Sequence, residues 1–221
     1  LEKYLSHARH VEVQIMGDGE GHVVHLFERD CSLQRRHQKM VEEAPCPVLT
    51  SAQRKALCDA AVAITRHISY ESAGTVEFIW DQDGETFYFL EMNTRIQVEH
   101  PVTEMVTGID LVREQIRLAG GEGLSFRQED IACTGHAIEC RITAESPDAG
   151  FRPCPGRIRE WTPPHGPDIR VDTHCFSGYE VPPYYDSLLA KLIVRGDTRP
   201  EAIERMQQAI ACFRVAGIDT T

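Results

Sequence analysis

The side chains best suited to chemistry lie in one run, residues 89–101 (FLEMNTRIQVEHP). Ionic and amide residues occupy every second position, namely Glu91, Asn93, Arg95, Gln97 and Glu99. Neighbouring side chains of a strand point to opposite faces, so this spacing predicts one strand with an apolar face and a polar face. Two carboxylates, a guanidinium and two amides in file could bind a cation and an anion. The alternative is an edge strand whose outer face carries ion pairs.

The segment before this run predicts which residue faces it. AGTVEFIW and ETFYFLEM form a hairpin with a turn at Asp83-Gly84, which brings Glu77 roughly opposite Glu91. Two adjacent carboxylates repel each other unless one takes a proton or a cation lies between them. The amide oxygen of Asn93 would add a third ligand. Few protein oxygens, with positions left for water and phosphate, favour Mg²⁺ over Ca²⁺.

A second group of candidate residues is the run from Gln34 to Lys39, whose side chains are all basic or amide. Such a run is either an anion site or a salt-bridged surface, and composition favours the surface. Arg35 and Arg36 are as well explained by pairing with nearby acidic residues or by a subunit contact as by catalysis. Cys31 has no identifiable partner base, so we expect a packed thiol and not a nucleophile.

Other patterns indicate the elements that position these residues. Residues 9–27 predict a hairpin, because the glycine-rich stretch leads into a strand and not into the helix that a phosphate loop opens. Cap residues and apolar spacing predict three helices. One covers 51–68 and is capped by Ser51, the second follows Asp110, and the third follows Thr198. The expected apolar stripes are Leu57, Ala60, Ala61, Ile64 and Ile68; Leu111, Ile116 and Leu118; and Ile203, Met206, Ile210 and Phe213.

Strands are expected at GHAIECRIT, which contains Arg141, and at 158–161, 169–171 and 190–194, with a loop over 146–157. The sequence therefore predicts an α+β fold with one continuous core.

Composition restricts the class of protein. The 221 residues carry a net charge of -11, which argues weakly against a nucleic-acid partner. Eight cysteines without a CxxC pair favour reduced thiols in a reducing compartment. No stretch approaches the roughly 20 apolar residues of a membrane span. The chain opens LEKYL without methionine, so we expect a fragment of a longer protein.

Several motifs in order resemble those of biotin carboxylases, the ATP-grasp components of biotin-dependent carboxylases. They are ERDCSLQRRHQKMVEEAP, GTVEFIW, FLEMNTRIQVEHPVTEM, GHAIECRI and GYEVPPYYDSLLAKLI. The resemblance implies the C-terminal half of an ATP-grasp domain with an antiparallel sheet at 1–125, and a truncated biotin carboxylase C-terminal region at 126–221. The family's amino-terminal domain and phosphate lid would lie upstream, so we predict that the fragment alone is inactive.

The same resemblance implies roles for individual residues. The ATP-binding residues would be Glu2, Lys3, Tyr4, Leu5, His10, Gln34, His37, Glu77 and Glu91. Glu77, Glu91 and Asn93 match the family's magnesium ligands, which agrees with the hairpin argument. The bicarbonate cradle would be Lys39, Arg95, Gln97 and the backbone of Val98, with Glu99 as general base. Arg141 would lie near the biotin ureido group.

These roles agree with elementary chemistry. A guanidinium such as Arg95 can bind planar bicarbonate through two parallel hydrogen bonds, and Lys39 adds a point charge. Glu99 would take the bicarbonate proton as an oxygen attacks the γ-phosphate of ATP, which gives carboxyphosphate and ADP. Phosphate released from carboxyphosphate could then deprotonate biotin, and Arg141 would stabilise the enolate-like oxygen.

The implied cofactors are ATP, Mg²⁺ with Mn²⁺ as a substitute, and biotin on a carrier protein or domain. The implied partners are that carrier, a carboxyltransferase and a second copy in a homodimer, without nucleic acid or membrane. The location would be cytoplasmic, or the mitochondrial matrix in a eukaryote. Two alternatives remain: another ATP-grasp ligase of the carbamoyl-phosphate synthetase type, and a non-catalytic dimerisation or scaffold module.

Overall fold

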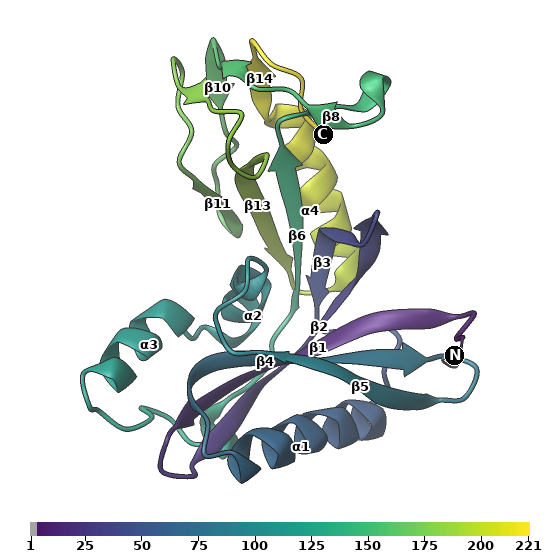
Figure 1. Ribbon diagram of the computed structural model, residues 1–221, viewed down its shortest axis with the longest axis vertical. Coiled ribbons are helices and arrows are strands. Elements are labelled where there is room, and N and C mark those ends of the chain that lie inside the picture. The colour runs from purple at the N-terminus through teal and green to yellow at the C-terminus, as the bar shows by residue number, and fades with distance from the viewer. Residues whose placement is uncertain (1–3) are drawn as a thin grey trace. The chain divides into compact units, whose positions relative to one another are not determined.

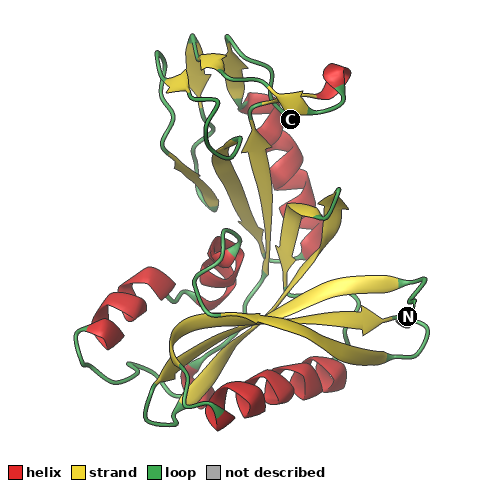
Figure 2. Cartoon of the chain, viewed as in Figure 1, coloured by secondary structure: helices red, strands yellow, loops and turns green. Residues whose placement is uncertain are grey.

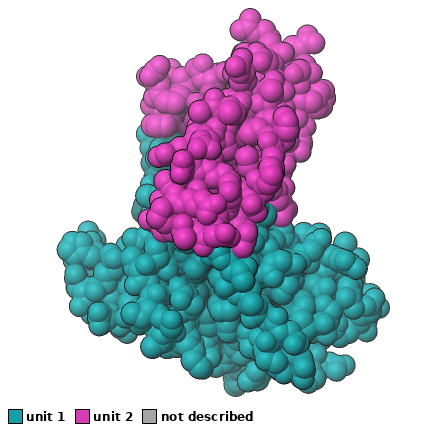
Figure 3. Space-filling view, turned by 180° about the vertical axis from the view of Figure 1, so that it is seen from behind, with its two compact units in different colours: residues 1–137 teal, residues 138–221 magenta. Residues whose placement is uncertain are grey.

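The computed structural model of the protein describes residues 4–221 and divides into two compact units, residues 1–137 and 138–221 (Figure 3). Helices and antiparallel sheet strands are mixed along the chain, which confirms the α+β class (Figure 2). Unit 1 contains two of the hydrophobic clusters and unit 2 a third, where the sequence predicted one continuous core. The predicted boundary after residue 125 stays a prediction. Within residues 4–221 no helix combines the length and apolar character needed to span a membrane.

Unit 1 is built on five antiparallel strands in the order β3-β2-β1-β4-β5 (Figure 1). Their bounds are β1 Ala8–Asp18, β2 Val23–Arg35, β3 Gln38–Ala44, β4 Glu71–Asp81 and β5 Thr86–Asn93. The helices of this unit are α1 Ser51–His67, α2 His100–Thr107, α3 Leu111–Ala119 and the 3₁₀ turn Gln128–Asp130. The predicted hairpins β1–β2 and β4–β5 are both present.

One face of this sheet is apolar and is covered by α1. Val11, Val13 and Ile15 of β1 pack with Val76, Phe78 and Trp80 of β4, and with Leu57, Cys58 and Ala61 of the helix. The helix begins after Thr50, which forms a capping box with Gln53, so the cap lies one residue before the predicted Ser51. The period of two in β1 and β4 therefore places their intervening residues on the opposite face.

That opposite face carries polar residues in a line across the strands. Glu12 pairs with Arg29 on one side and with Glu77 on the other, and Glu77 pairs with Glu91. Directly opposite residues of antiparallel strands share a face, so the four side chains form one row across β2, β1, β4 and β5. The predicted register of Glu77 against Glu91 is confirmed.

Unit 2 contains the neighbouring strands β11 and β13 and all of β6 except its first two residues, together with three short strand pairs and one helix. The longer strands are β6 His136–Thr143, β11 Ile169–Thr173 and β13 Leu188–Gly196. The short ones are β7 Glu145–Ser146, β8 Arg152–Pro153, β9 Gly156–Arg157, β10 Glu160–Thr162, β12 Glu180–Val181 and β14 Arg214–Ala216, with the 3₁₀ turn Pro147–Ala149. Helix α4, Arg199–Cys212, is capped by Thr198 as predicted.

Three sequence predictions about these elements are wrong in part. Strand β5 ends at Asn93, and the chain then leaves the sheet before α2 begins, so the run 89–101 is not one strand. In α3, Ile116 is 69% exposed, and Leu111 and Leu118 provide the buried stripe. In α4, Ile210 is 47% exposed because the helix buries Ala202, Met206 and Ala209. The buried stripe thus keeps the predicted Met206, but its alanines lie one position before the predicted Ile203 and Ile210.

A buried carboxylate cluster as candidate active site

The polar face of unit 1 holds a group that we call the Lys39 cluster: Lys39, Glu12, Glu77, Glu99 and His10. The ammonium of Lys39 donates to Glu12 Oε2 at 2.5 Å, to Glu77 Oε1 at 3.0 Å and to Glu99 Oε1 at 2.5 Å. His10 Nε2 lies 2.8 Å from Glu77 Oε2. The three carboxylates are buried, and only 14% of the Lys39 side chain is exposed.

Three carboxylates so close together are tolerated because each contacts the same cation. Burial alone would raise the pKa of Glu77, but the close contact with His10, the charge of Lys39 and the hydrogen bond from Gln97 lower it to about 2. Burial would likewise raise the pKa of Glu12, but the charges of Arg29 and Lys39 lower it. Burial lowers and the carboxylates raise the pKa of Lys39, with a net increase. Glu12, Glu77 and Lys39 are therefore ionised at neutral pH.

Arg29 holds residues of the cluster and its surroundings through hydrogen bonds. It lies on β2, is fully buried, and donates hydrogen bonds to five side chains. The acceptors are Glu12 Oε1 at 2.6 Å, Gln14 Oε1 at 2.7 Å, Thr103 Oγ1 at 3.0 Å, Gln97 Oε1 at 3.1 Å and Thr75 Oγ1 at 3.2 Å. Burying a guanidinium is favourable only when its donors are satisfied, and all three of its nitrogens donate here.

The segment between β5 and α2 still brings its polar residues to this face, although it is not a strand. Gln97 is buried and donates from Nε2 to Glu77 Oε1 at 2.7 Å. Glu99 reaches Lys39, as described above. Arg95 is exposed and donates to Asn93 Oδ1 at 3.3 Å and to the carbonyl of Ile96 at 3.2 Å. The predicted convergence of Gln97 and Glu99 is thus present, with a different backbone geometry.

The predicted metal ligands are adjacent. Asn93 Nδ2 donates to Glu77 Oε1 at 3.1 Å and to Glu91 Oε1 at 3.2 Å. A donor between two carboxylates occupies the place where a divalent cation would be expected, and rotation of the amide would turn its oxygen toward that place. The donor set of two carboxylates and one amide oxygen fits Mg²⁺.

The predicted nucleotide residues are distributed as follows. Gln34 Nε2 contacts His10 Nδ1 at 3.0 Å and donates to the carbonyl of Cys31 at 2.8 Å. His37 is exposed in the turn between β2 and β3, with a positive φ of 65°. Tyr4 is 87% exposed. Glu2 and Lys3 lie outside the described residues.

Val98 and Arg141, two further predicted site residues, are both half-buried. Val98, the backbone candidate for bicarbonate, is half-buried between Gln97 and Glu99. Arg141 lies on β6 in unit 2 and is half-buried. Their predicted roles stay predictions.

Sequence reasoning missed Arg29 and Glu12 as parts of the site. Glu12 alternates with Val11 and Val13, a pattern from which we predicted only a hairpin. Cys31 is fully buried beside Glu12 and Glu99, and burial raises the pKa of its thiol well above its usual range, which agrees with the expected packed thiol. Glu43 contacts His136 at 2.7 Å, a partner that the sequence did not indicate.

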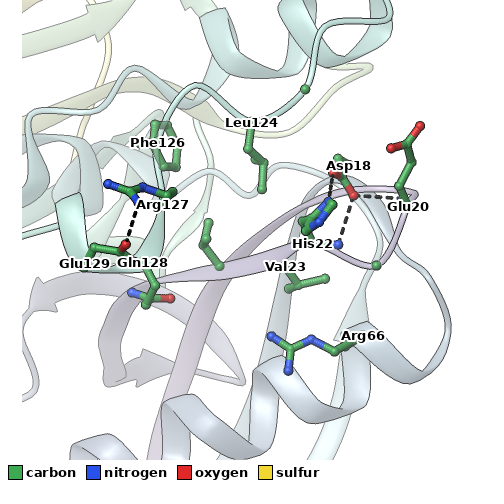
Figure 4. Close-up of a pocket in the computed structure, with 13 residues that line it drawn as sticks. Asp18, Glu20, His22, Val23, Arg66, Leu124, Phe126, Arg127, Gln128 and Glu129 are labelled. Carbon is green, nitrogen blue, oxygen red and sulfur yellow. Dashed lines mark hydrogen bonds and ion pairs between the residues drawn. The ribbon is translucent and has the colours of Figure 1, made fainter.

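A separate pocket of about 690 Å³ lies at the far end of the β1–β2 hairpin (Figure 4). Asp18 accepts hydrogen bonds there from the backbone of Glu20 and His22, and its Oδ2 lies 2.7 Å from His22 Nδ1. Leu124 and Phe126 supply apolar lining. Among the predicted site residues that the structure describes, none lines this pocket.

Two family models match successive parts of the chain. A family model described as "Carbamoyl-phosphate synthase L chain, ATP binding domain" matches residues 1–127, which defines the class as an ATP-binding domain of that kind. A second, "Biotin carboxylase C-terminal domain", matches residues 139–221. With both matches in this order, the chain belongs to the biotin carboxylase family.

Individual relatives agree with this assignment. The chain is 55% identical to a biotin carboxylase of Nostoc sp. over all of its own length and 49% of the relative. It is 58% identical to the chloroplastic biotin carboxylase of Arabidopsis thaliana, over 100% of this chain and 41% of the relative. The chain therefore spans about half the length of the curated relatives it matches.

A solved structure is also closely similar. The biotin carboxylase domain dimer of the Hydrogenobacter thermophilus 2-oxoglutarate carboxylase, in complex with MgADP, ADP and bicarbonate, is 51% identical. It superposes with a TM-score of 0.97 over 100% of this chain and 48% of that chain. The fold of this chain is therefore that of a biotin carboxylase.

Proposed function

We propose that this chain forms part of the active site of a biotin carboxylase, which carboxylates carrier-bound biotin with ATP and bicarbonate through carboxyphosphate. The proposal depends on the Lys39 cluster, in which a largely buried ammonium contacts three carboxylates and shares Glu77 Oε1 with the Gln97 amide. The bicarbonate and MgADP in the Hydrogenobacter thermophilus structure support the same assignment.

Lys39, Arg95, Gln97 and the backbone N–H of Val98 would bind bicarbonate. Lys39 and Gln97 both contact Glu77 Oε1, so the ammonium and the amide lie within reach of one small anion. The exposed guanidinium of Arg95 would close the site from the solvent side with two parallel hydrogen bonds. Bound bicarbonate would replace part of the carboxylate contacts of Lys39, so the ammonium would still contact an anion.

Glu99 would act as the general base. Its Oε1 lies 2.5 Å from Lys39 Nζ, so an anion bound by Lys39 would be adjacent to this carboxylate. As bicarbonate attacks the γ-phosphate, its proton would pass to Glu99, while Lys39 keeps the negative charge of the anion stabilised.

Glu77, Glu91 and Asn93 would hold Mg²⁺, and the bound ion would neutralise charge on the phosphates of ATP. His10, Gln34, His37, Tyr4 and Leu5, together with Glu2 and Lys3, would contact the nucleotide. The contact between Gln34 and His10 links this group to Glu77.

The reaction partners are also proposed. Arg141 would stabilise the ureido oxygen of biotin, which a carrier protein or domain would deliver, and a carboxyltransferase would use the product. We propose a homodimer, as in the crystallised Hydrogenobacter thermophilus domain, and a cytoplasmic location or the mitochondrial matrix in a eukaryote. Because the chain spans about half the length of its relatives, we propose that the 221 residues alone do not turn over ATP.

The test is bicarbonate-dependent release of phosphate from ATP by the full-length protein, with free biotin or ammonia as the acceptor. Stimulation by biotin is expected, whereas stimulation by ammonia would indicate a carbamoyl-phosphate synthetase type of ligase, with which the chain shares its first family match. An Arg95→Ala variant tests the scaffold alternative, since a scaffold role predicts altered assembly with unchanged chemistry per folded site.

A further inference from the structure

Arg29 has no role in the function proposed above, although it contacts residues of the candidate site. Its guanidinium is fully buried, so it is not placed to meet substrate itself. Its hydrogen bonds nevertheless end on Gln97 and Glu12, and each of these residues is joined to the proposed bicarbonate site.

The contact with Gln97 fixes which way the amide points. Gln97 Oε1 accepts from Arg29 Nη2 at 3.1 Å, and Gln97 Nε2 donates to Glu77 Oε1 at 2.7 Å. An amide nitrogen has two hydrogens, so one remains to donate to an anion. If the amide turned over, its oxygen would face the Glu77 carboxylate, and the site would present an acceptor where bicarbonate needs a donor.

The contact with Glu12 fixes Lys39. Arg29 Nε donates to Glu12 Oε1 at 2.6 Å, while Lys39 Nζ donates to Glu12 Oε2 at 2.5 Å. The Glu12 carboxylate thus uses one oxygen for each cation and is fully buried between them. Arg29 thereby holds the anion on which the position of the Lys39 ammonium depends.

Three further hydrogen bonds fix the orientation of the Arg29 guanidinium itself. Arg29 Nη1 donates to Gln14 and Thr103, and Nη2 also donates to Thr75. These partners come from β1, β4 and α2, so the guanidinium plane is fixed by three elements of unit 1. A planar group with all its nitrogens engaged can transmit an orientation, which a single ammonium cannot.

We propose that Arg29 is a positioning residue for bicarbonate, which orients the Gln97 amide directly and the Lys39 ammonium through Glu12. This inference rests on the proposed function. Arg29, a buried group of β2, has no contact with substrate itself, and its effect on bicarbonate binding acts through Gln97 and Glu12.

The test is Arg29→Lys in the full-length protein. Lysine keeps the positive charge beside Glu12, but its one nitrogen cannot reach Glu12 and Gln97 together in the fork geometry of arginine. The KM for bicarbonate is expected to rise about tenfold or more, while the KM for ATP stays within about twofold. In a Gln97→Ala background the same substitution should have a smaller effect on the bicarbonate KM, because the amide that Arg29 orients is already absent.

Arg54→Lys is the matched control. Arg54 Nε donates to the buried Glu28 at 2.6 Å, so this variant disturbs a comparable arginine–carboxylate contact in the same unit without touching the Lys39 cluster. Its KM for bicarbonate should equal that of the wild type. Equal changes in the two variants, or a wild-type bicarbonate KM in a folded Arg29→Lys protein, would overturn the inference.

If Arg29→Lys does not fold, Thr75→Val and Thr103→Val replace it. Thr75 supports Nη2, the nitrogen that holds Gln97, whereas Thr103 supports Nη1, which does not contact Gln97. A larger increase in the bicarbonate KM for Thr75→Val supports the proposal, and equal values refute it. A wild-type protein without bicarbonate-dependent ATP cleavage would instead refute the proposed function.

Discussion

Replacing Lys39 by methionine tests the electrostatics of the cluster most sensitively. The substitution removes the one ammonium that contacts Glu12, Glu77 and Glu99, and leaves three buried carboxylates without it. Removal of one partner from a buried ion pair typically destabilises a protein by about 3–5 kcal/mol. We expect a loss in the lower part of that range at neutral pH, since His10 and Arg29 still contact two of the carboxylates.

The pKa of Glu77 gives an independent magnitude. A decrease from 4.5 to about 2 corresponds to about 3 kcal/mol of stability, to which Lys39 contributes together with His10 and Gln97. Because the folded-state pKa is lowered, this stability is present above pH 4.5 and is lost as the pH falls toward 2. The methionine variant lacks part of it, so the difference from the wild type should shrink, by less than about 1 kcal/mol, between neutral pH and about pH 4.

The assay is urea-induced unfolding of the full-length wild type and variant at both pH values. Lys55→Met is the control, because Lys55 contacts Asp59 in an exposed ion pair on α1 at 2.5 Å. Exposed pairs of this kind contribute below about 1 kcal/mol. A Lys39→Met loss no larger than that of the control, or one that grows as the pH falls, would refute the reasoning.

Three further outcomes are expected. Cys31 should resist alkylation at about pH 8 in the folded protein and react only in urea, because burial raises the pKa of its thiol. The exposed Cys212 should react under both conditions. Prompt labelling of Cys31 in the folded protein would contradict this prediction. Asn93→Ala should raise the Mg²⁺ concentration needed for half-maximal ATP cleavage severalfold, and an unchanged Mg²⁺ dependence would exclude Asn93 as a ligand. Thr50→Ala should destabilise unit 1 by about 1 kcal/mol without changing the bicarbonate KM, since it removes only the capping box of α1.

The sequence alone could predict the Glu77–Glu91 pair because local information determines it. The two residues lie on one hairpin, and the turn at Asp83-Gly84 fixes their register to within a residue. The end of β5 at Asn93 was not predicted, since alternation of polar and apolar residues continues beyond it. Pro101 in the first turn of α2 was an available signal for a helix start there.

The contribution of Arg29 could not be predicted in the same way. Its partners lie on β1, β4, α2 and the segment before α2, and the spatial proximity of these elements depends on pairing between strands distant in the sequence. The alternation of Glu12 and Gln14 with Val11, Val13 and Ile15 predicted a hairpin but not the complete burial of the two polar side chains, which depends on elements distant in the sequence. The nucleotide and biotin roles rested on family resemblance and stay predictions.

The most direct test of the account is transfer of radiolabel from bicarbonate to biotin by the full-length protein, compared between wild type and Glu99→Gln. The proposed mechanism makes Glu99, which contacts Lys39, the base that takes the bicarbonate proton. It predicts ATP-dependent labelling by the wild type and a loss of about 10²–10⁴-fold in the folded variant, which is the usual contribution of a general base. Labelling at the wild-type rate by Glu99→Gln, with Mg²⁺ and ATP saturating, would contradict it.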